Sequence, residues 1–203
     1  LLPYYQTQLK KLGVKVRLGK EATAAAIRAA RPEAVVMATG VEPLVPAIPG
    51  VDRPNVVLAG QVLEGTAKVG QRVVVIGGEM VGGEVAEFLA AQGRQVTVAS
   101  RGQQVAQKVT MAMRELLLLR LEALKVRLLT GVTYQEITEK GLVITREGRR
   151  EVIEADTVVL AAGAVPRKGP EVKGAAVTAV GDCVQPRGLK EAIAEGCKAG
   201  MGL

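Results

Sequence analysis

The 203-residue sequence contains no histidine, two cysteines and four aromatic residues. Without histidine, the chain cannot form a Ser-His-Asp or Cys-His catalytic set, a histidine-ligated metal site or an imidazole acid–base pair. Cys183 and Cys197 are 14 positions apart, which excludes a CxxC redox pair and a four-cysteine zinc or iron–sulfur site. We interpret both as small buried hydrophobic residues in a protein of the reducing cytoplasm. An aromatic content of 2% argues against a base-stacking nucleic-acid module.

Long hydrophobic runs are absent as well. The most apolar stretch, which begins at Leu116, is interrupted by a charge within four residues, whereas a membrane-spanning helix needs about 20 apolar residues. We therefore expect neither a membrane nor a nucleic-acid partner. The N-terminus is not methionine and lacks the apolar core and cleavage site of a signal peptide. We expect the chain to be an excerpt of a longer protein.

The net charge of +7 is concentrated near the N-terminus, because the first 40 residues contain seven basic and only two acidic residues. Basic residues in this stretch alternate with apolar ones. A solvated face is the simpler interpretation of this pattern, and a surface that attracts phosphate is the alternative.

Apolar spacing together with glycine and proline positions predicts an α/β protein. The prolines of residues 41–55 predict an irregular connector. In the helix expected at 81–92, the apolar stripe consists of Val81, Val85 and Leu89. Helices are expected at 3–12, 21–30, 81–92, 108–125 and from about 189; strands are expected at 14–18, 34–38, 72–76, 95–99, 126–129, 157–161 and 177–180, with three more between 132 and 153.

The most informative motif joins the strand at 72–76 to the helix that follows it. Glycines between a strand and a helix leave backbone N–H groups and the positive end of the helix dipole facing one point, which suits a pyrophosphate. Against the dinucleotide pattern GxGxxG, Gly77 supplies the tight turn and Gly82 the close helix–strand contact. The members of the motif are Gly77, Gly78, Glu79, Met80, Val81 and Gly82.

Glu79 occupies the position where the pattern has its middle glycine. A β-carbon at a position that needs a positive φ costs roughly 1 to 2 kcal/mol, and a carboxylate beside a phosphate adds a repulsion of about 1 kcal/mol. Together they predict an affinity for dinucleotide that is roughly tenfold to several-hundredfold lower than with glycine at this position. Two interpretations stay open: a weakened but working site, or a site in which Glu79 itself occupies the anion position and caps the helix.

The end of the strand at 95–99 is where such units distinguish NAD from NADP. An acid there pairs with the ribose 2′-hydroxyl, but this chain has Ser100 and Arg101, which suit a 2′-phosphate. NADP is therefore favoured over NAD, and a loop arginine in solvent is the alternative. Glu84, in the first turn of the helix, is either a residue near the nicotinamide or a surface acid that interacts with the helix dipole.

Three other strands end at small residues, where backbone can pass close to a ligand. Their order around the glycine motif resembles the flavoproteins with two dinucleotide-binding domains, the FAD- and NAD(P)-dependent pyridine nucleotide reductases. The residues after Cys183 narrow the resemblance to the C-terminal part of the NADH:flavin oxidoreductase group that includes 2,4-dienoyl-CoA reductase, 2-enoate reductase and trimethylamine dehydrogenase. These strand ends are Ala38-Thr39-Gly40, Ala161-Ala162-Gly163 and Gly181-Asp182-Cys183, the last followed by Pro186-Arg187 and Glu191-Ala192-Ile193.

The resemblance implies roles in FAD binding. Asp182 would accept a hydrogen bond from the ribityl or ribose region, and the helix that begins near Leu189 and Lys190 would point its N-terminus at the flavin. Ala22 would meet the adenine through its backbone, and Ala38, Thr39 and Gly40 would lie along the FAD, while Glu84 would approach the nicotinamide. The alternatives are a turn or capping acid for Asp182 and an ordinary strand-ending turn for Thr39 and Gly40.

The fold class that follows is α/β, with two dinucleotide-binding, Rossmann-like domains, the second inserted in an incomplete first. The FAD domain would comprise residues 1–40 and 164–203, joined through a connector at 41–70 to an NAD(P) domain at 71–163. The FAD domain's own glycine-rich turn and the family's barrel, with FMN and an iron–sulfur cluster, are missing from this sequence, so we expect FAD to bind weakly or not at all.

The leading hypothesis is the electron-entry part of a reductase that passes hydride from NADPH, or NADH, to FAD and then electrons to the barrel, which reduces an enoyl-type substrate. The alternatives are a non-catalytic module that binds ADP or another nucleotide and a stand-alone FAD-dependent reductase. The barrel region or chain is the expected partner, and a homo-oligomer stays open.

Overall fold

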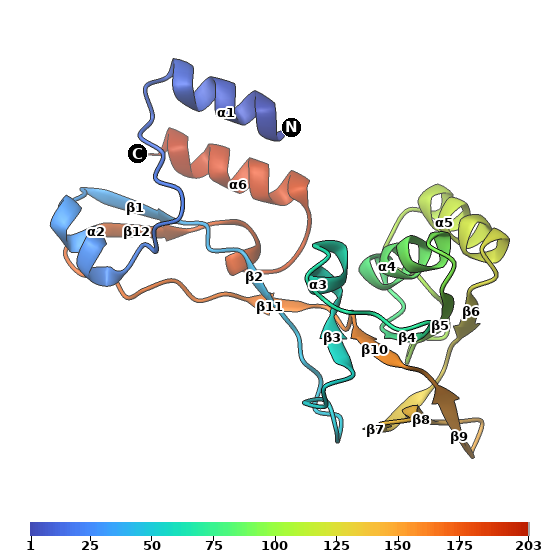
Figure 1. Cartoon of the computed structure of the whole chain (residues 1–203). Coiled ribbons are helices and arrows are strands. Elements are labelled where there is room, and N and C mark those ends of the chain that lie inside the picture. Colours follow the sequence, from blue (N-terminus) through green and yellow to red (C-terminus); the bar gives the residue numbers. More distant parts are fainter. Residues whose placement is uncertain (203) are drawn as a thin grey trace. The chain divides into compact units, whose positions relative to one another are not determined.

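The computed structural model describes residues 1–202, which form two compact units. Unit 1 joins Leu1–Gly40 to the segment that begins at Arg167, and unit 2 is the continuous stretch Val41–Pro166. Figure 1 shows the chain passing through unit 2 between the two parts of unit 1. Within residues 1–202, no helix has both the length and the apolar character needed to cross a membrane.

Unit 2 is built on a five-stranded parallel sheet. Three helices and a three-stranded antiparallel sheet accompany it, and a short antiparallel pair, β2 and β11, lies where the chain enters and leaves the unit (Figure 1). The parallel sheet runs in the order β3 (Val56–Leu58), β10 (Thr157–Leu160), β4 (Arg72–Ile76), β5 (Gln95–Ala99), β6 (Arg127–Leu129). The other elements are α3 (Ala59–Leu63), α4 (Met80–Ala91), α5 (Met111–Ala123), β7 (Thr133–Thr138), β8 (Gly141–Arg146), β9 (Arg149–Glu154), β2 (Val41–Pro43) and β11 (Ala164–Pro166).

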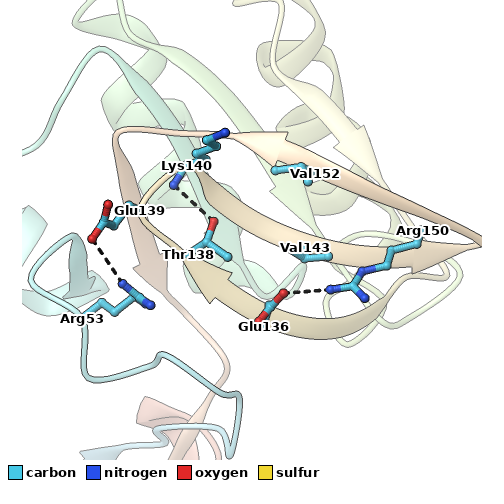
Figure 2. A pocket seen from close by; sticks show the side chains of 8 residues that line it. All are labelled: Arg53, Glu136, Thr138, Glu139, Lys140, Val143, Arg150 and Val152. Atoms are coloured by element: carbon cyan, nitrogen blue, oxygen red, sulfur yellow. Dashed lines mark hydrogen bonds and ion pairs between the residues drawn. The ribbon is translucent and has the colours of Figure 1, made fainter.

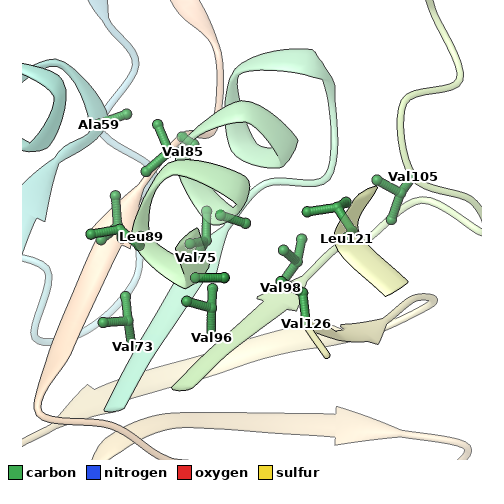
Figure 3. Packing of buried hydrophobic residues seen from close by; sticks show 14 of the residues in the cluster. Ala59, Val73, Val75, Val85, Leu89, Val96, Val98, Val105, Leu121 and Val126 are labelled. Carbon is green, nitrogen blue, oxygen red and sulfur yellow. The ribbon is translucent and has the colours of Figure 1, made fainter. Parts of the chain in front are cut away.

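Both faces of the parallel sheet are buried. Val73 and Val75 pack into a cluster with α4 and α5, which Figure 3 shows, whereas Val74 and Ile76 pack into a second cluster with residues of β7–β9. Successive side chains of a strand point to opposite faces, so a strand covered on both sides needs apolar residues at every position. This requirement explains the uninterrupted apolar run of β4.

Strand β4 lies where the direction of the sheet's connections reverses. From β4 the chain continues to β5 and β6 on one side, and it returns later to add β10 on the other side. Ile76, the last residue of β4, is in register with Leu160 of β10 and Ala99 of β5. Ligands of open parallel sheets bind at the carboxyl ends of the strands beside such a reversal, so this edge is where a site is expected.

At the opposite edge of the sheet, Arg72 and Asp156 hold β4 and β10 together. One carboxylate oxygen of Asp156 accepts from the Arg72 guanidinium at 2.7 Å, and the other accepts from the Arg72 backbone N–H at 2.8 Å. The side chain of Arg72, and then its backbone N–H, hold the pKa of Asp156 below its ordinary value of 3.8.

Replacing Asp156 should change how stability depends on pH. Because the folded-state pKa is lowered, the carboxylate contributes stability above pH 3.8 that is lost as the pH falls through the folded value. We expect Asp156→Asn to lower the urea midpoint of unfolding at pH 7, with a difference from wild type that shrinks in strong acid. Glu139→Gln is the control, since that side chain is 92% exposed; a difference that stays constant down to strong acid would contradict the assignment.

Unit 1 contains few buried side chains. Its two-stranded sheet pairs β1 with β12 in parallel, Ala34 opposite Ala176. None of its three α-helices has a buried residue, and Val180 is the one hydrophobic residue of this unit, as far as it is described, that is less than 9% exposed. Its elements are α1 (Leu2–Lys11), α2 (Ala24–Ala30), β1 (Ala34–Met37), β12 (Ala176–Ala179), the 3₁₀ turn η1 (Gly181–Cys183) and α6 (Leu189–Met201).

Two expectations about backbone structure were wrong. The strand expected at 14–18 is not formed, because a strand needs a hydrogen-bonding neighbour and no described strand lies beside this exposed stretch. The proline-rich residues 41–55 are not wholly irregular, since they contain β2, and the expected connector 41–70 also contains β3 and α3. β2 tolerates Pro43 because it is paired on one side only, with β11.

Two expectations about burial were also wrong. Val81 is 51% exposed and does not belong to the buried face of α4. That face includes Val85, Ala86 and Leu89. Cys197 is exposed, because it lies on α6, a helix without buried residues, and Cys183 is only partly buried. The Cys183 thiol lies within hydrogen-bonding distance of the Met37 carbonyl oxygen, at 3.2 Å.

Candidate functional site

The glycine turn between β4 and α4 leaves no room for side chains. A Cβ on Gly77, whose φ is +121°, would lie 2.2 Å from the Ala161 carbonyl oxygen. A Cβ on Gly82 would lie 2.0 Å from the Gly77 carbonyl oxygen, and one on Gly78 would lie 2.5 Å from the Ser100 side chain. The start of α4 is therefore packed directly against the strand ends, and the N–H groups of its first turn have no partner within the helix.

Glu79 is the residue at the N-cap of α4, and its backbone is extended, with φ −83°. The penalty for a positive φ therefore does not apply, which corrects one part of the weakening expected from the sequence. The side chain makes no capping hydrogen bond. Instead, Oε2 accepts from the backbone N–H of Lys108 at 3.3 Å. Of the two interpretations left open for Glu79, the one in which its side chain caps the helix is therefore not formed, and the loop after β5 supplies the donor instead.

The loop after β5 is attached to the glycine turn. The N–H of Ala106 donates to the Gly78 carbonyl oxygen at 2.6 Å, and Ala106 is buried in the left-handed conformation, with φ +54°. Val105 is also buried, and its carbonyl accepts from the Arg114 guanidinium at 2.8 Å. The loop therefore forms one wall beside the turn.

Ser100 and Arg101 follow β5 directly and differ in exposure. Ser100 is only 6% exposed and lies behind Gly78, whereas the Arg101 side chain is exposed. The Arg101 guanidinium carbon lies 5.8 Å from the centroid of the Tyr134 ring. Ser100 and Arg101 form a corner beside the glycine turn, and at this corner Arg101 exposes a long cationic side chain to solvent.

Tyr134, in β7, is half-buried beneath this corner. Its hydroxyl donates to the Ala99 carbonyl oxygen at 2.8 Å, and the same carbonyl accepts from the Gly77 N–H at 3.0 Å. Burial raises the pKa of Tyr134 above its ordinary value of 10.0, and the nearby charge of Arg101 opposes that rise. The phenol therefore remains protonated at neutral pH and keeps its role as a donor.

The remaining predicted residues of unit 2 are distributed along α4 and after β10. Met80 is partly buried, and the side chains of Val81 and Glu84 are exposed on α4. Gly163 has φ +112°, and its carbonyl accepts from the Leu44 N–H at 3.0 Å. The structure thus brings the glycine turn, Ser100 and Arg101 to one edge, and it gives Gly163 a place in the pairing of β2 with β11.

The predicted residues of unit 1 form two groups. Thr39 donates from its hydroxyl to the Arg167 carbonyl oxygen, and the Gly40 carbonyl accepts from the Arg167 N–H at 3.0 Å. Asp182 accepts from the Arg187 N–H at 3.1 Å, which is the turn role given above as the alternative to FAD binding. The Gly181 N–H donates to Glu195 at 2.7 Å. Ala22, Ala38, Leu189 and Lys190 are exposed.

The described residues of unit 1 do not by themselves fit FAD. Its two paired strands are followed by Gly40 and by Gly181, and neither glycine opens a helix against a tightly packed strand as Gly77–Gly82 do. The amide of Gly181 and one carboxylate oxygen of Asp182 are already hydrogen-bonded within the unit. The glycine turn of unit 2, by contrast, fits the diphosphate of a nicotinamide dinucleotide, because close packing and free first-turn amides are both present.

A hollow of about 430 Å³ on the three-stranded sheet is a different feature (Figure 2). Arg150 pairs with Glu136 at 2.8 Å, and Arg53 lies 3.8 Å from Glu139. These charges compensate one another, and no residue of the glycine turn contributes to the lining, so the hollow is not part of the nucleotide site. It is lined by Arg53, Glu136, Thr138, Glu139, Lys140, Val143, Arg150 and Val152.

Sequence reasoning missed Tyr134 and the loop that contains Ala106. Tyr134 reaches Ala99 across 35 positions of the chain, and no local pattern announces such a contact. The loop offered one usable signal, because the apolar pair Val105-Ala106 interrupts an otherwise polar stretch.

Comparison with known proteins agrees with this geometry. The chain is 36% identical over 200 residues to bilirubin reductase of Mediterraneibacter gnavus, covering 96% of this chain and 31% of that protein. It superposes on a 2-naphthoyl-CoA reductase structure with a TM-score of 0.93 and 37% identity, covering 98% of this chain and 31% of that one. The NADH-bound water-forming NADH oxidase of Lactobacillus brevis gives a TM-score of 0.54 and 28% identity, covering 66% and 31%.

The chain thus spans about a third of the length of these relatives. The matches confirm the resemblance stated from the sequence, the α/β dinucleotide-binding fold class, and the expected cofactors of the family, FAD with NADP or NAD. The profile of one family covers residues 15–196. By that match, the chain belongs to the pyridine nucleotide-disulphide oxidoreductase family.

Proposed function

We propose that this chain is the electron-entry part of a flavin-dependent oxidoreductase. The whole protein would accept hydride from NADPH onto FAD and pass electrons to a barrel with FMN and an iron–sulfur cluster that reduces an enoyl-type substrate. In this proposal, residues 71–163 bind the nicotinamide dinucleotide, and residues 1–40 and 164–203 contribute part of the FAD domain. The two free cysteines favour a reducing compartment such as the cytoplasm.

The observation that carries the proposal is the closely packed glycine turn at the start of α4. Gly77 and Gly82 meet at a distance that excludes a Cβ, and the 12-residue helix presents its first-turn amides at the carboxyl edge of the parallel sheet. Backbone donors and the helix dipole would hold the dinucleotide's diphosphate there. The nicotinamide then supplies the hydride, while this chain binds and orients it.

Arg101 supports NADP over NAD. Its guanidinium is exposed at the corner that follows β5, and a guanidinium forms charge-assisted, two-pronged hydrogen bonds with phosphate oxygens. Ser100 and Arg101 occupy the positions where a carboxylate would bind a free 2′-hydroxyl. Ser100 is buried behind Gly78, so in this proposal Arg101 makes the main contact with the 2′-phosphate.

Calorimetry with NADPH, NADH and ADP tests nucleotide binding by the chain. We expect NADPH to bind most tightly, and no binding of either dinucleotide would overturn the proposal. Binding of ADP alone would instead favour a nucleotide-binding module without hydride transfer, the candidate that the half-buried Glu79 carboxylate at the turn supports. In the full-length protein that contains this chain, NADPH should bleach the flavin absorbance in a stopped-flow experiment.

Removing the charge of Glu79 should strengthen binding. The backbone of Glu79 is unstrained, so the remaining cost is the repulsion between its carboxylate and the diphosphate, about 1 kcal/mol. We expect Glu79→Gln to raise the affinity for NADPH and ADP about fivefold, with a smaller gain at high salt. Glu115→Gln, an exposed charge change on α5, is the control, and equal gains from both variants would contradict a local effect.

A further inference from the structure

We propose that Tyr134 is a positioning residue that holds Arg101 where it binds the 2′-phosphate of NADPH, so that Tyr134 contributes to the preference for NADPH over NADH. The inference rests on the proposed function and adds a residue from a different sheet to the same site. No motif in the sequence assigns Tyr134 to nucleotide binding.

Tyr134 forms a hydrogen bond beneath the proposed site. The Tyr134 hydroxyl and the Gly77 N–H both donate to the Ala99 carbonyl oxygen, at 2.8 and 3.0 Å. Ala99 ends β5 and Arg101 follows two residues later. One carbonyl therefore connects the turn that would hold the diphosphate with the corner that would hold the 2′-phosphate, and Tyr134 fixes that carbonyl from below.

Arg101 lies over the ring of Tyr134. The guanidinium carbon lies 5.8 Å from the centroid of the Tyr134 ring, within the range of a cation–π interaction. Among residues 1–202, no carboxylate forms an ion pair with Arg101. The ring is thus the contact that orients this exposed side chain, and it leaves the guanidinium N–H groups free for a phosphate.

Strand β7 is irregular next to Tyr134. Its pairing with β8 shifts register between Tyr134 and Glu136, so that Tyr134 pairs with Ile144 and Glu136 with Val143. Such a bulge redirects the side chain beside it and is common next to binding sites. The irregularity in β7 directly follows Tyr134, the residue whose hydroxyl reaches Ala99 at the end of β5.

Two substitutions separate the ring from the hydroxyl. Tyr134→Leu removes both, whereas Tyr134→Phe keeps the ring under Arg101 and removes only the bond to Ala99. Calorimetry with NADPH and NADH would measure the ratio of the two affinities. We expect Tyr134→Leu to lower this ratio about fivefold. Tyr134→Phe, which keeps the ring and loses only the bond to Ala99, should lower it by less. The probes 2′,5′-ADP and 5′-AMP should give the same ratios, because they differ by the 2′-phosphate.

A double-mutant cycle completes the test. If Tyr134 acts through Arg101, Tyr134→Leu should not lower the ratio further in an Arg101→Ala background. Circular dichroism and thermal unfolding show whether each variant is folded, and a ratio of two affinities is insensitive to the folded fraction. If the wild-type protein prefers NADPH and Tyr134→Leu keeps the full preference, this inference is overturned while the proposed function stands. Absence of dinucleotide binding to wild type would overturn it together with the proposed function.

Discussion

Gly82→Ala is expected to abolish dinucleotide binding and to lower the free energy of unfolding of unit 2 by about 3 kcal/mol. The added Cβ would lie 2.0 Å from the Gly77 carbonyl oxygen and 2.9 Å from its carbonyl carbon. Both are backbone atoms, so no side-chain rotation relieves the overlap. The helix must move away from the strand end, and the donors for a diphosphate move with it. Calorimetry with NADPH and a urea titration would measure the two effects.

Substitutions at two other glycines, where an added Cβ meets less resistance, serve as comparisons for Gly82→Ala. A Cβ on Gly83 would meet the end of the Leu117 side chain at 2.7 Å, a neighbour that can rotate, so Gly83→Ala should destabilise less than Gly82→Ala. A Cβ on Gly60, in helix α3, would meet nothing within 4 Å, and Gly60→Ala should leave stability unchanged or raise it. Equal losses from all three variants would contradict the proposed close packing.

Arg101→Ala is expected to weaken NADPH binding about thirtyfold and to leave NADH binding within about twofold of wild type. The loss corresponds to about 2 kcal/mol, the size of a charge-assisted hydrogen bond to phosphate. NADH lacks the 2′-phosphate, so it loses nothing comparable. Titration calorimetry with each dinucleotide at the same salt concentration would measure the split.

Arg127→Ala is the matched control for the loss of one positive charge. Arg127 is exposed and begins β6, at the amino edge of the parallel sheet rather than the carboxyl edge where Arg101 lies. If both variants weakened NADPH and NADH to the same degree, net charge would explain the effect, and the assignment of Arg101 to a 2′-phosphate would be wrong.

The buried strands of unit 2 could be predicted closely from the sequence. The expected strands at 72–76 and 95–99 match β4 and β5 residue for residue. β4 carries an uninterrupted apolar run after Arg72, as a strand covered on both faces requires, and β5 alternates valines with polar residues. The helix expected at 81–92 forms as Met80–Ala91, one residue earlier at both ends. In these segments local pattern and tertiary packing demand the same conformation.

The elements that failed depend on partners distant in the chain. β2 forms despite Pro43, because β11, more than 100 residues later, pairs with it. Residues 14–18 have strand-like alternation but no described neighbour to pair with. The conformation of Glu79 was also beyond the pattern, since a glycine position in a motif does not by itself require a positive φ. Its carboxylate is directed by a loop amide of Lys108, a contact that only the folded chain defines.

The pairing of β2 with β11 has a consequence for how this architecture can be rearranged. Val41 lies opposite Pro166, and the Arg167 N–H donates to the Gly40 carbonyl oxygen, so the chain enters and leaves Val41–Pro166 at adjacent points. A module whose two ends are already held together can be excised, replaced by a short turn or transplanted into another host chain with little loop-closure entropy. The compact unit Val41–Pro166 can in that sense be exchanged as a whole between host chains.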